Sequence, residues 1–257
     1  MDLLYLRGSL PTEPTLFSEM NVSVGGSDVA DLGVSLRPGL KVSGRLEFNG
    51  SAEKPTADQV PSIAISLEPA DGRTSGASSS ARGRAEGNGQ FTTVGVPAGR
   101  YLMRVTNAPK GWALRGAFFN GQDIADTAVE LRGGDADGVV ITFTDKPTDL
   151  SGTVTDESGA GDAKAAVLVF PTDRSAWTGS GTAPRRLKNL RTKTDGTYST
   201  VNLPPGDYFV VAVSDAVAGN WDDPKFLEAL TPAAARMHLD EGEKKTQTLR
   251  TAKVLSR

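Results

Sequence analysis

The chain has 257 residues, which allows one large domain or two ordinary ones, and its 38% hydrophobic content is sufficient for packed cores. Glycine (29) and proline (15) exceed their average usage, which indicates many turns. Cysteine is absent, histidine occurs once (His238) and the net charge is only −3, so the composition excludes thiolate and multi-histidine metal centres and gives no basic field for nucleic acid.

The first 38 residues carry no targeting or membrane signal. The apolar run at residues 3–6 is shorter than the core of a secretory signal peptide, and every other apolar stretch is only long enough for a strand, so we expect no membrane insertion. Residues 26–39 match residues 121–134 at eight of fourteen positions. Because the second copy closes a domain, we expect residues 1–38 to be the C-terminal part of a truncated preceding β-sandwich.

Residues 39–146 alternate between apolar and polar side chains in short runs, the pattern of half-buried antiparallel strands. The run at residues 73–87 has no such period and is rich in serine and glycine, so we expect a mobile loop there. The alternation predicts strands at residues 42–48, 62–67, 91–94, 101–105, 128–131 and 139–143.

Residues 147–257 show the same alternation with one interruption. Asp223 followed by Pro224, with Phe226, Leu227 and Leu230 on one face, predicts a short helix with Asp223 as its N-cap. Strands are predicted at residues 153–155, 166–170, 187–193, 198–201, 208–213, 236–239 and 246–254.

An internal repeat sets the domain boundaries. Residues 88–101 align without a gap with residues 195–208, 107 positions later, and residues 42–44 match residues 150–152 at nearly the same spacing. We therefore expect two domains, 39–146 and 147–257. In each repeat Tyr101 or Tyr208 follows a Pro-x-Gly-x turn, and we expect both rings to be buried at equivalent places.

The second repeat resembles the carboxypeptidase regulatory-like domain. The resemblance rests on Leu-Ser-Gly-x-Val-x-Asp at 150–156, Asp-Gly-x-Tyr at 195–198 and Leu-Pro-Pro-Gly-x-Tyr at 203–208, and the first repeat matches more loosely. It implies an all-β fold of tandem transthyretin-like (Ig-like or carbohydrate-binding-like) β-sandwiches, each of about seven antiparallel strands. Together the two repeats cover most of the chain.

The resemblance also implies a non-catalytic role, because this domain accompanies peptidases without performing the cleavage. We expect no enzymatic activity and no cofactor or metal, but a structural or interaction module, a spacer or adhesive segment of a larger bacterial envelope or secreted protein. Its expected partners are other domains of the same longer chain, and a glycan or another envelope protein. Tandem copies of this kind imply an extracellular or cell-envelope location.

The alternative function is a carbohydrate-binding module that contacts glycan through exposed tryptophan rings. Trp177, in the small-residue loop 175–181, is the first candidate for glycan contact, followed by Trp112 and Trp221. The competing interpretation is that these tryptophan rings fold back over the sandwich and are buried. Exposed tryptophan rings lying in one plane would favour the carbohydrate-binding module.

Three polar features have simpler interpretations. His238 alternates with apolar neighbours and lacks a nucleophile-elbow motif, which favours a solvent-facing strand position. The repeated aspartates, at 28 and 31 and again at 123 and 126, are typical of turns, although they supply oxygen ligands. Five cations between positions 185 and 193 offer a site for an anionic polymer, but a solvated edge strand explains them better.

Overall fold

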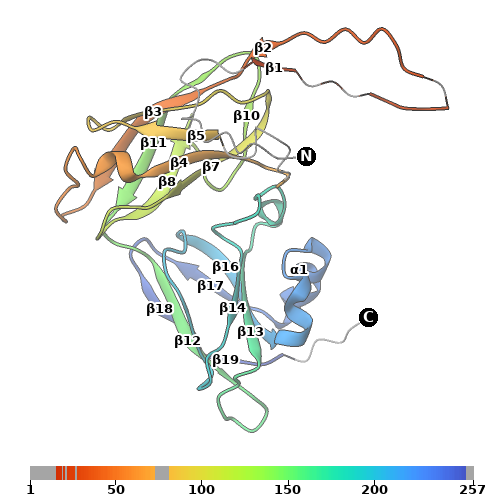
Figure 1. Cartoon of the computed structure of the whole chain (residues 1–257). Helices are drawn as coiled ribbons and strands as arrows, with labels where there is room; N and C mark the ends of the chain where they lie inside the picture. The colour runs from red at the N-terminus through yellow and green to blue at the C-terminus, as the bar shows by residue number, and fades with distance from the viewer. Residues whose placement is uncertain (1–15, 19, 21, 27, 73–80, 253–257) are drawn as a thin grey trace, which may run out of the picture.

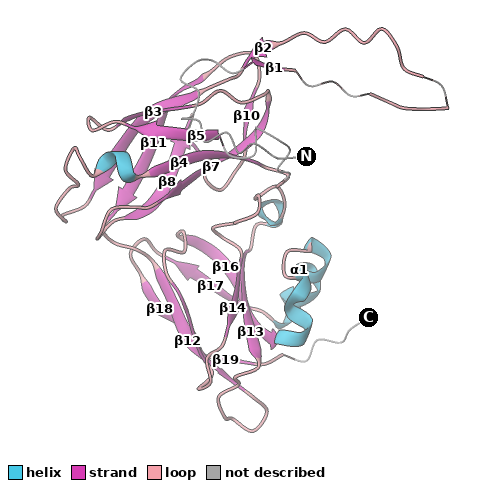
Figure 2. Ribbon diagram, in the orientation of Figure 1, coloured by secondary structure: helices cyan, strands magenta, loops and turns pink. Residues whose placement is uncertain are grey.

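The computed structural model describes residues 16–18, 20, 22–26, 28–72 and 81–252, and β-strands make up most of their regular secondary structure (Figures 1 and 2). The sheets have two, nine, four and four strands. The predicted all-β fold is therefore confirmed.

The nine-stranded sheet folds over on itself and encloses one core, and we call it the N-terminal sandwich. Val42, Ile65 and Ile141, which come from strands in different parts of the sheet, all contribute to this core. Its strands are β3 (Val42–Asn49), β4 (Ala64–Pro69), β5 (Ala81–Ala85), β6 (Gln90–Thr93), β7 (Gly99–Thr106), β8 (Ala113–Phe119), β9 (Gln122–Asp123), β10 (Val129–Leu131) and β11 (Ala136–Thr144).

Two four-stranded sheets packed face to face form what we call the C-terminal sandwich, which lies below the first one in Figure 1. Leu150 and Tyr198 of one sheet meet Val167 and Val210 of the other in its core. Its strands are β12 (Asp149–Thr155), β13 (Ala165–Pro171), β14 (Lys188–Arg191), β15 (Thr197–Thr200), β16 (Gly206–Ser214), β17 (Ala235–Leu239), β18 (Lys244–Thr246) and β19 (Leu249–Arg250).

The two sandwiches share one pattern of strand pairing. β3 pairs with β6 and β11, and β4 pairs with β5 and β7. In the C-terminal sandwich β12 pairs with β15 and β18, and β13 pairs with β14 and β16. The last corresponding pairs are β7 with β10 and β16 with β17.

The expectation of purely antiparallel strands is wrong at one place in each sandwich. β11 runs parallel to β3, and β18 and β19 run parallel to β12. A parallel neighbour is distant in sequence, so the local alternation carries no sign of it. The single strand predicted at residues 246–254 is instead the short pair β18 and β19, and residues 253–254 lie outside the described residues.

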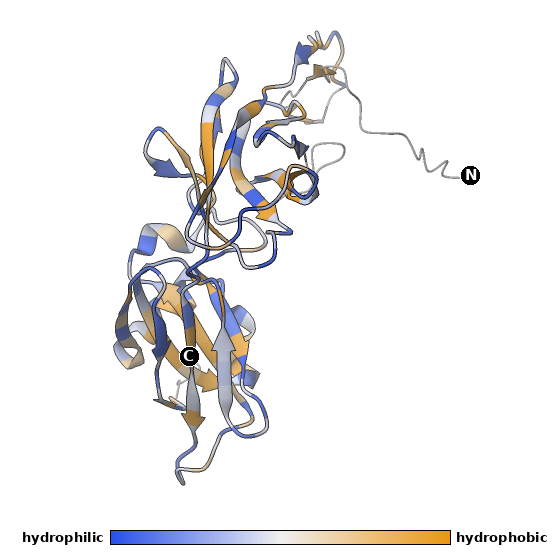
Figure 3. Cartoon of the chain, turned by 90° about the vertical axis from the view of Figure 1, so that its left-hand side faces the viewer, coloured by the Kyte–Doolittle hydropathy of each residue, from blue (hydrophilic) through white to orange (hydrophobic). Residues whose placement is uncertain are grey.

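The predicted helix is confirmed as α1 (Pro224–Leu230), with the Asp223 carboxylate accepting from the Lys225 N–H. Leu227 and Leu230 cover the outer face of the sheet that contains β13 and β16, so these two strands are buried on both faces and not half-buried. Figure 3 shows the resulting apolar interior of the C-terminal sandwich. Short 3-10 helices lie at Val60–Ser62, Arg174–Trp177, Asp215–Asn220 and Thr231–Ala233.

The N-terminal sandwich contains strands that the sequence pattern did not predict. β5 lies within the run expected to be a loop, and it pairs with both β4 and β6. β8 and β9 were also missed. A Cβ at Gly83 would lie 3.2 Å from Thr93 and 3.3 Å from Ile65, so this position of β5 favours glycine. Because glycine has no side chain, this part of β5 does not produce an alternating pattern.

The expected burial of the repeated tyrosines is confirmed. Tyr101 is 5% exposed and Tyr208 is 0% exposed. Each hydroxyl donates to the carbonyl oxygen of the proline four residues earlier, Pro97 at 3.0 Å and Pro204 at 2.6 Å. The ring is therefore buried without leaving its hydroxyl unpaired, and the bond closes the Pro-Gly turn.

Among the described residues before Gly39, β1 (Leu16–Phe17) and β2 (Arg37–Pro38) pair as a two-stranded sheet. The chain between these strands projects away from both sandwiches (Figure 1), and its described residues are exposed. Phe17 approaches Gly39 at the start of the N-terminal sandwich.

Candidate functional site

The tryptophans expected to contact glycan do not form an exposed platform. Trp112 is 6% exposed, packs edge-on against Phe48 and donates its indole N–H to the Glu53 carbonyl. Trp177 is 4% exposed and donates to the Pro171 carbonyl at 2.8 Å. Both rings are thus core residues, each with its polar group satisfied.

Trp221 is half-buried against the core beneath α1, so it alone of the three presents part of its ring to solvent. Glycan binding through these tryptophans stays a prediction, and the burial of Trp112 and Trp177 does not favour it.

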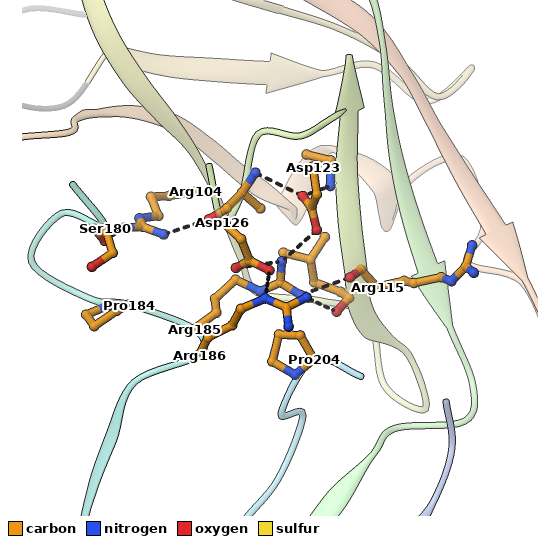
Figure 4. Close-up of polar contacts among 12 residues, drawn as sticks. Arg104, Arg115, Asp123, Asp126, Ser180, Pro184, Arg185, Arg186 and Pro204 are labelled. Atoms are coloured by element: carbon orange, nitrogen blue, oxygen red, sulfur yellow. Dashed lines mark hydrogen bonds and ion pairs between the residues drawn. The ribbon is translucent and has the colours of Figure 1, made fainter. Parts of the chain in front are cut away.

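A cluster of charged groups lies between the two sandwiches, and we call it the junction (Figure 4). It is built around Arg185 and Arg186, which lie on the long connection from β13 to β14. Figure 1 shows this connection reaching from the C-terminal sandwich toward the N-terminal one. The predicted solvated edge is therefore wrong for these two arginines.

Arg185 is bound by both side-chain and backbone groups of the N-terminal sandwich. Its guanidinium lies 3.4 Å from the Asp123 carboxylate and 3.4 Å from that of Asp126. It also donates to the carbonyl oxygens of Leu114, at 3.3 Å, and Arg115, at 2.9 Å. Its side chain is only 16% exposed.

Arg186 joins the repeated tyrosine turn to the same acidic pair. Its Nε donates to the Asp126 carboxylate at 2.8 Å, and its Nη1 donates to the Pro205 carbonyl at 3.0 Å and to the Tyr208 hydroxyl at 3.2 Å. The turn that closes the C-terminal sandwich is thus hydrogen-bonded, through one guanidinium, to the neighbouring sandwich.

A second cluster joins the N-terminal sandwich to the same β13–β14 connection. Arg104 on β7 pairs with Glu68 on β4, and it also donates to the Ser180 carbonyl at 2.6 Å. The Glu68 carboxylate accepts from the backbone N–H and the hydroxyl of Thr182. Arg104 and Glu68 are each 14% exposed, so this pair holds the β13–β14 connection from a largely buried position.

The surroundings shift the pKa values of two junction carboxyls, Asp123 and Glu68, in opposite directions. Burial raises the pKa of Asp123, and the charge of Asp126 adds to this effect while Arg185 opposes it. Burial also disfavours ionisation of Glu68, but its hydrogen bonds from Thr182 and its ion pair with Arg104 outweigh burial and lower its pKa. Glu68 is therefore the more firmly ionised of the two acids.

Beside these groups lies a cavity of about 300 Å³, lined by Arg104, Asp126 and Arg186 and by residues of the β13–β14 connection. The three arginines in its wall, Arg104, Arg185 and Arg186, are already paired with carboxylates of the protein. One oxygen of Asp126 accepts no hydrogen bond from the described residues and lies 3.4 Å from the Arg185 guanidinium. This chemistry suits a contact between protein parts better than a site for an anion.

The covalent link between the sandwiches is short, only residues 145–148. The Asp145 carboxylate accepts from the backbone N–H groups of Ser51 and Ala52, at 2.6 and 2.8 Å. The Thr148 hydroxyl donates to the Asp240 carbonyl. The link is therefore attached to the body of a sandwich at both of its ends.

His238 lies on the surface of β17, as predicted, between two carboxylates. Its Nδ1 is 2.8 Å from Asp207, and its Nε2 is 3.3 Å from Asp240. The hydrogen bond to Asp207 and the two negative charges raise the pKa of His238 above 6.5. No partner of a nucleophilic triad adjoins it among the contacts of the described residues.

We expect an NMR titration of His238, the only histidine, to give a midpoint above 6.5, and Asp207→Asn to lower it. Because its pKa is raised on folding, the charged ring stabilises the fold below pH 6.5, and this contribution is lost as the pH rises through the raised pKa. Glu228→Gln, remote from His238, is the control. A midpoint unaffected by Asp207→Asn would contradict the assigned contact.

Within the residues that the structure describes, no group of three or more His, Cys, Asp or Glu side chains is arranged to hold a metal ion. The same part of the chain has no helix that is long and apolar enough to cross a membrane.

Comparison with known proteins gave no matching family model and no matching curated protein. Among solved structures, the chain is similar to the minor pilin of Streptococcus agalactiae, with 12% identity and a TM-score of 0.31 over 85% of this chain and 100% of that one. It is similar to the shaft pilin SpaA of Lactobacillus rhamnosus GG at 10% identity and a TM-score of 0.30, covering 85% and 100%. The Bacillus anthracis TIE protein matches at 11% identity and 0.26, covering 85% and 36%.

Proposed function

We propose that the chain is a non-catalytic structural segment of a larger bacterial envelope or secreted protein, in which 39–146 and 147–257 are two domains held in a fixed relative orientation. The observation that carries this proposal is the insertion of Arg185 and Arg186 of one sandwich into the acidic pair Asp123 and Asp126 of the other. A spacer has to keep its domains in a defined relative position, and the contacts of this junction restrict motion between the two sandwiches.

Three features of the junction support stiffness over flexible tethering. The link of residues 145–148 is too short to allow wide excursions. Charged contacts join the sandwiches at separate places, including the exposed pair of Arg115 and Glu241 at 2.9 Å. A rotation about the link would break these contacts together and leave low-exposure charges such as Asp126 unpaired, which is costly.

The sequence resemblance to carboxypeptidase regulatory-like domains supports the same role. In that family the domain accompanies other domains, and tandem copies are typical of envelope and secreted proteins. A surface or secreted location for this chain is part of the proposal. The burial of Trp112 and Trp177 does not favour the carbohydrate-binding alternative.

The orientation can be measured by pulsed electron-electron double resonance between two spin labels. Because the chain lacks cysteine, two introduced cysteines are the only residues that a thiol-reactive label modifies. Thr92→Cys on β6 and Ala229→Cys on α1 place one label at an exposed position of each sandwich. We expect one narrow distance distribution. Arg185→Ala with Arg186→Ala should broaden it, because the buried carboxylates then lose their partners.

Arg174→Ala is the matched control, since it removes an arginine from an ion pair with Glu228 that lies within the C-terminal sandwich and is 65% exposed on the arginine side. It should leave the distribution unchanged. A broad distribution in the unsubstituted chain would refute the fixed orientation. A narrow distribution that the double substitution does not alter would refute the role of Arg185 and Arg186 in holding it.

A further inference from the structure

The exposed apolar surface of this protein is concentrated in one segment. Among the described residues, eight of the nine exposed large hydrophobic side chains lie before Gly39, and the ninth is Val201. The eight are Leu16, Met20, Val22, Val24, Val29, Leu32, Val34 and Leu36. Scattered single apolar residues are ordinary on a surface. Here exposed apolar side chains recur at every second position at 20, 22 and 24 and again at 32, 34 and 36, as on one face of a strand, which indicates a missing partner.

The internal repeat identifies the kind of partner. Residues 26–39 match residues 121–134, which form β9, β10 and the turn between them. The matching apolar positions differ completely in burial. Val34 is 63% exposed and its counterpart Val129 is 8% exposed, while Leu36 is 62% exposed and Leu131 is 2% exposed.

The burial of the second copy has a definite cause. Val129 and Leu131 lie on β10, which pairs with β7 at Tyr101 and Gly99, and their side chains enter the core of the N-terminal sandwich. The first copy has valine and leucine at the same positions, Val34 and Leu36. Among the described residues, however, no strand equivalent to β7 lies beside them.

The polar positions of the repeat carry independent information. Asp28 and Asp31 match Asp123 and Asp126, the two carboxylates that receive Arg185 across the junction. Both aspartates of the first copy are exposed. The repeat therefore preserves the side chains that face a core together with the side chains that face the next sandwich.

We propose that residues 28–36 are the closing turn and strand of a further β-sandwich of the same kind, supplied by the polypeptide that precedes this chain, with residues 34–36 as the strand, and that Asp28 and Asp31 belong to a second junction. This inference rests on the proposed role as part of a series of sandwiches. Only five residues separate Leu36 from Val42, where β3 begins, so that sandwich ends one strand earlier than the N-terminal one, which continues into β11.

The test compares residues 1–257 with the natural polypeptide extended by about 110 upstream residues, roughly one sandwich. Hydrogen exchange of the amides of residues 28–36 is followed by mass spectrometry. In residues 1–257 alone we expect fast exchange, and in the longer polypeptide exchange slower by about 100-fold, as in a strand of a folded core.

Three substitutions in the longer polypeptide make the test specific. Val34→Asp should abolish the slow exchange of residues 28–36. Val201→Asp, at an equally exposed valine outside this segment, should leave it unchanged, and Val129→Asp should disrupt the N-terminal sandwich instead. The inference is overturned by exchange equally fast in both polypeptides, by protection already present in residues 1–257 alone, or by the absence of an upstream sandwich in the natural protein. The distance distribution across the Arg185 junction is measured separately, so either proposal can fail alone.

Discussion

Replacement of Tyr208 by alanine is expected to lower the free energy of unfolding of the C-terminal sandwich by about 3–5 kcal/mol, the usual cost of truncating a large aromatic side chain in a core. The ring is fully buried between the two sheets, where it packs in the same core as Val210 and Leu239. The substitution also removes the hydroxyl that bonds the Pro204 carbonyl and accepts from Arg186.

Tyr208→Phe separates these contributions, because it keeps the ring and removes only the hydroxyl. We expect it to cost about 1 kcal/mol, the net value of a typical hydrogen bond. Urea denaturation and amide exchange of β16 give both values. Burial raises the pKa of Tyr208 to about 12, so in an ultraviolet titration of the folded protein Tyr208 should ionise at a higher pH than an exposed tyrosine. A loss below about 1 kcal/mol for Tyr208→Ala would place the ring at the surface.

Replacement of Gly152 by alanine is expected to cost about 3 kcal/mol or to displace the strands beside β12. A Cβ on Gly152 would lie 1.9 Å from the carbonyl oxygen of Gln247, a backbone atom between β18 and β19. The equivalent Gly44 has the same constraint, with a Cβ 1.8 Å from the carbonyl oxygen of Val139 on β11. The repeated glycine is thus required by the close approach of the parallel neighbour in each sandwich.

Gly134→Ala is the matched control, since a Cβ there meets nothing within 4 Å. It should change the free energy of unfolding by less than about 0.5 kcal/mol. Gly152→Ala with the same stability as the unsubstituted chain would show that the strands beside β12 move at no cost, and would contradict the tight parallel pairing.

The features that could be predicted from sequence are those specified by nearby residues. The Pro-x-Gly-x-Tyr turns place Tyr101 and Tyr208 in the cores, because the turn and the aromatic ring are only two residues apart. The helix α1 follows from Asp223 as N-cap and an apolar face within one short stretch. In both cases the local preference and the tertiary packing agree.

The features that were missed depend on residues far apart in the chain. Arg185 is 62 positions from Asp123, and no local pattern distinguishes a cation that enters a junction from one on a solvated edge. Trp177 lies in a loop of small residues, yet it reaches the core because the loop turns back over Phe170. The one signal available for the junction was the repeat of the aspartate pair, at 28 and 31 and again at 123 and 126, and turn formation alone could explain it.

The fixed orientation of the two sandwiches is tested most directly by residual dipolar couplings of backbone amides in the unsubstituted chain. Amides of β3–β11 and of β12–β19 are analysed separately in one weakly aligning medium. The account predicts that both sets give the same alignment tensor in magnitude and direction, because the Arg185 and Arg186 contacts hold the sandwiches together. Two tensors of clearly different magnitude would show independent motion and would contradict the account.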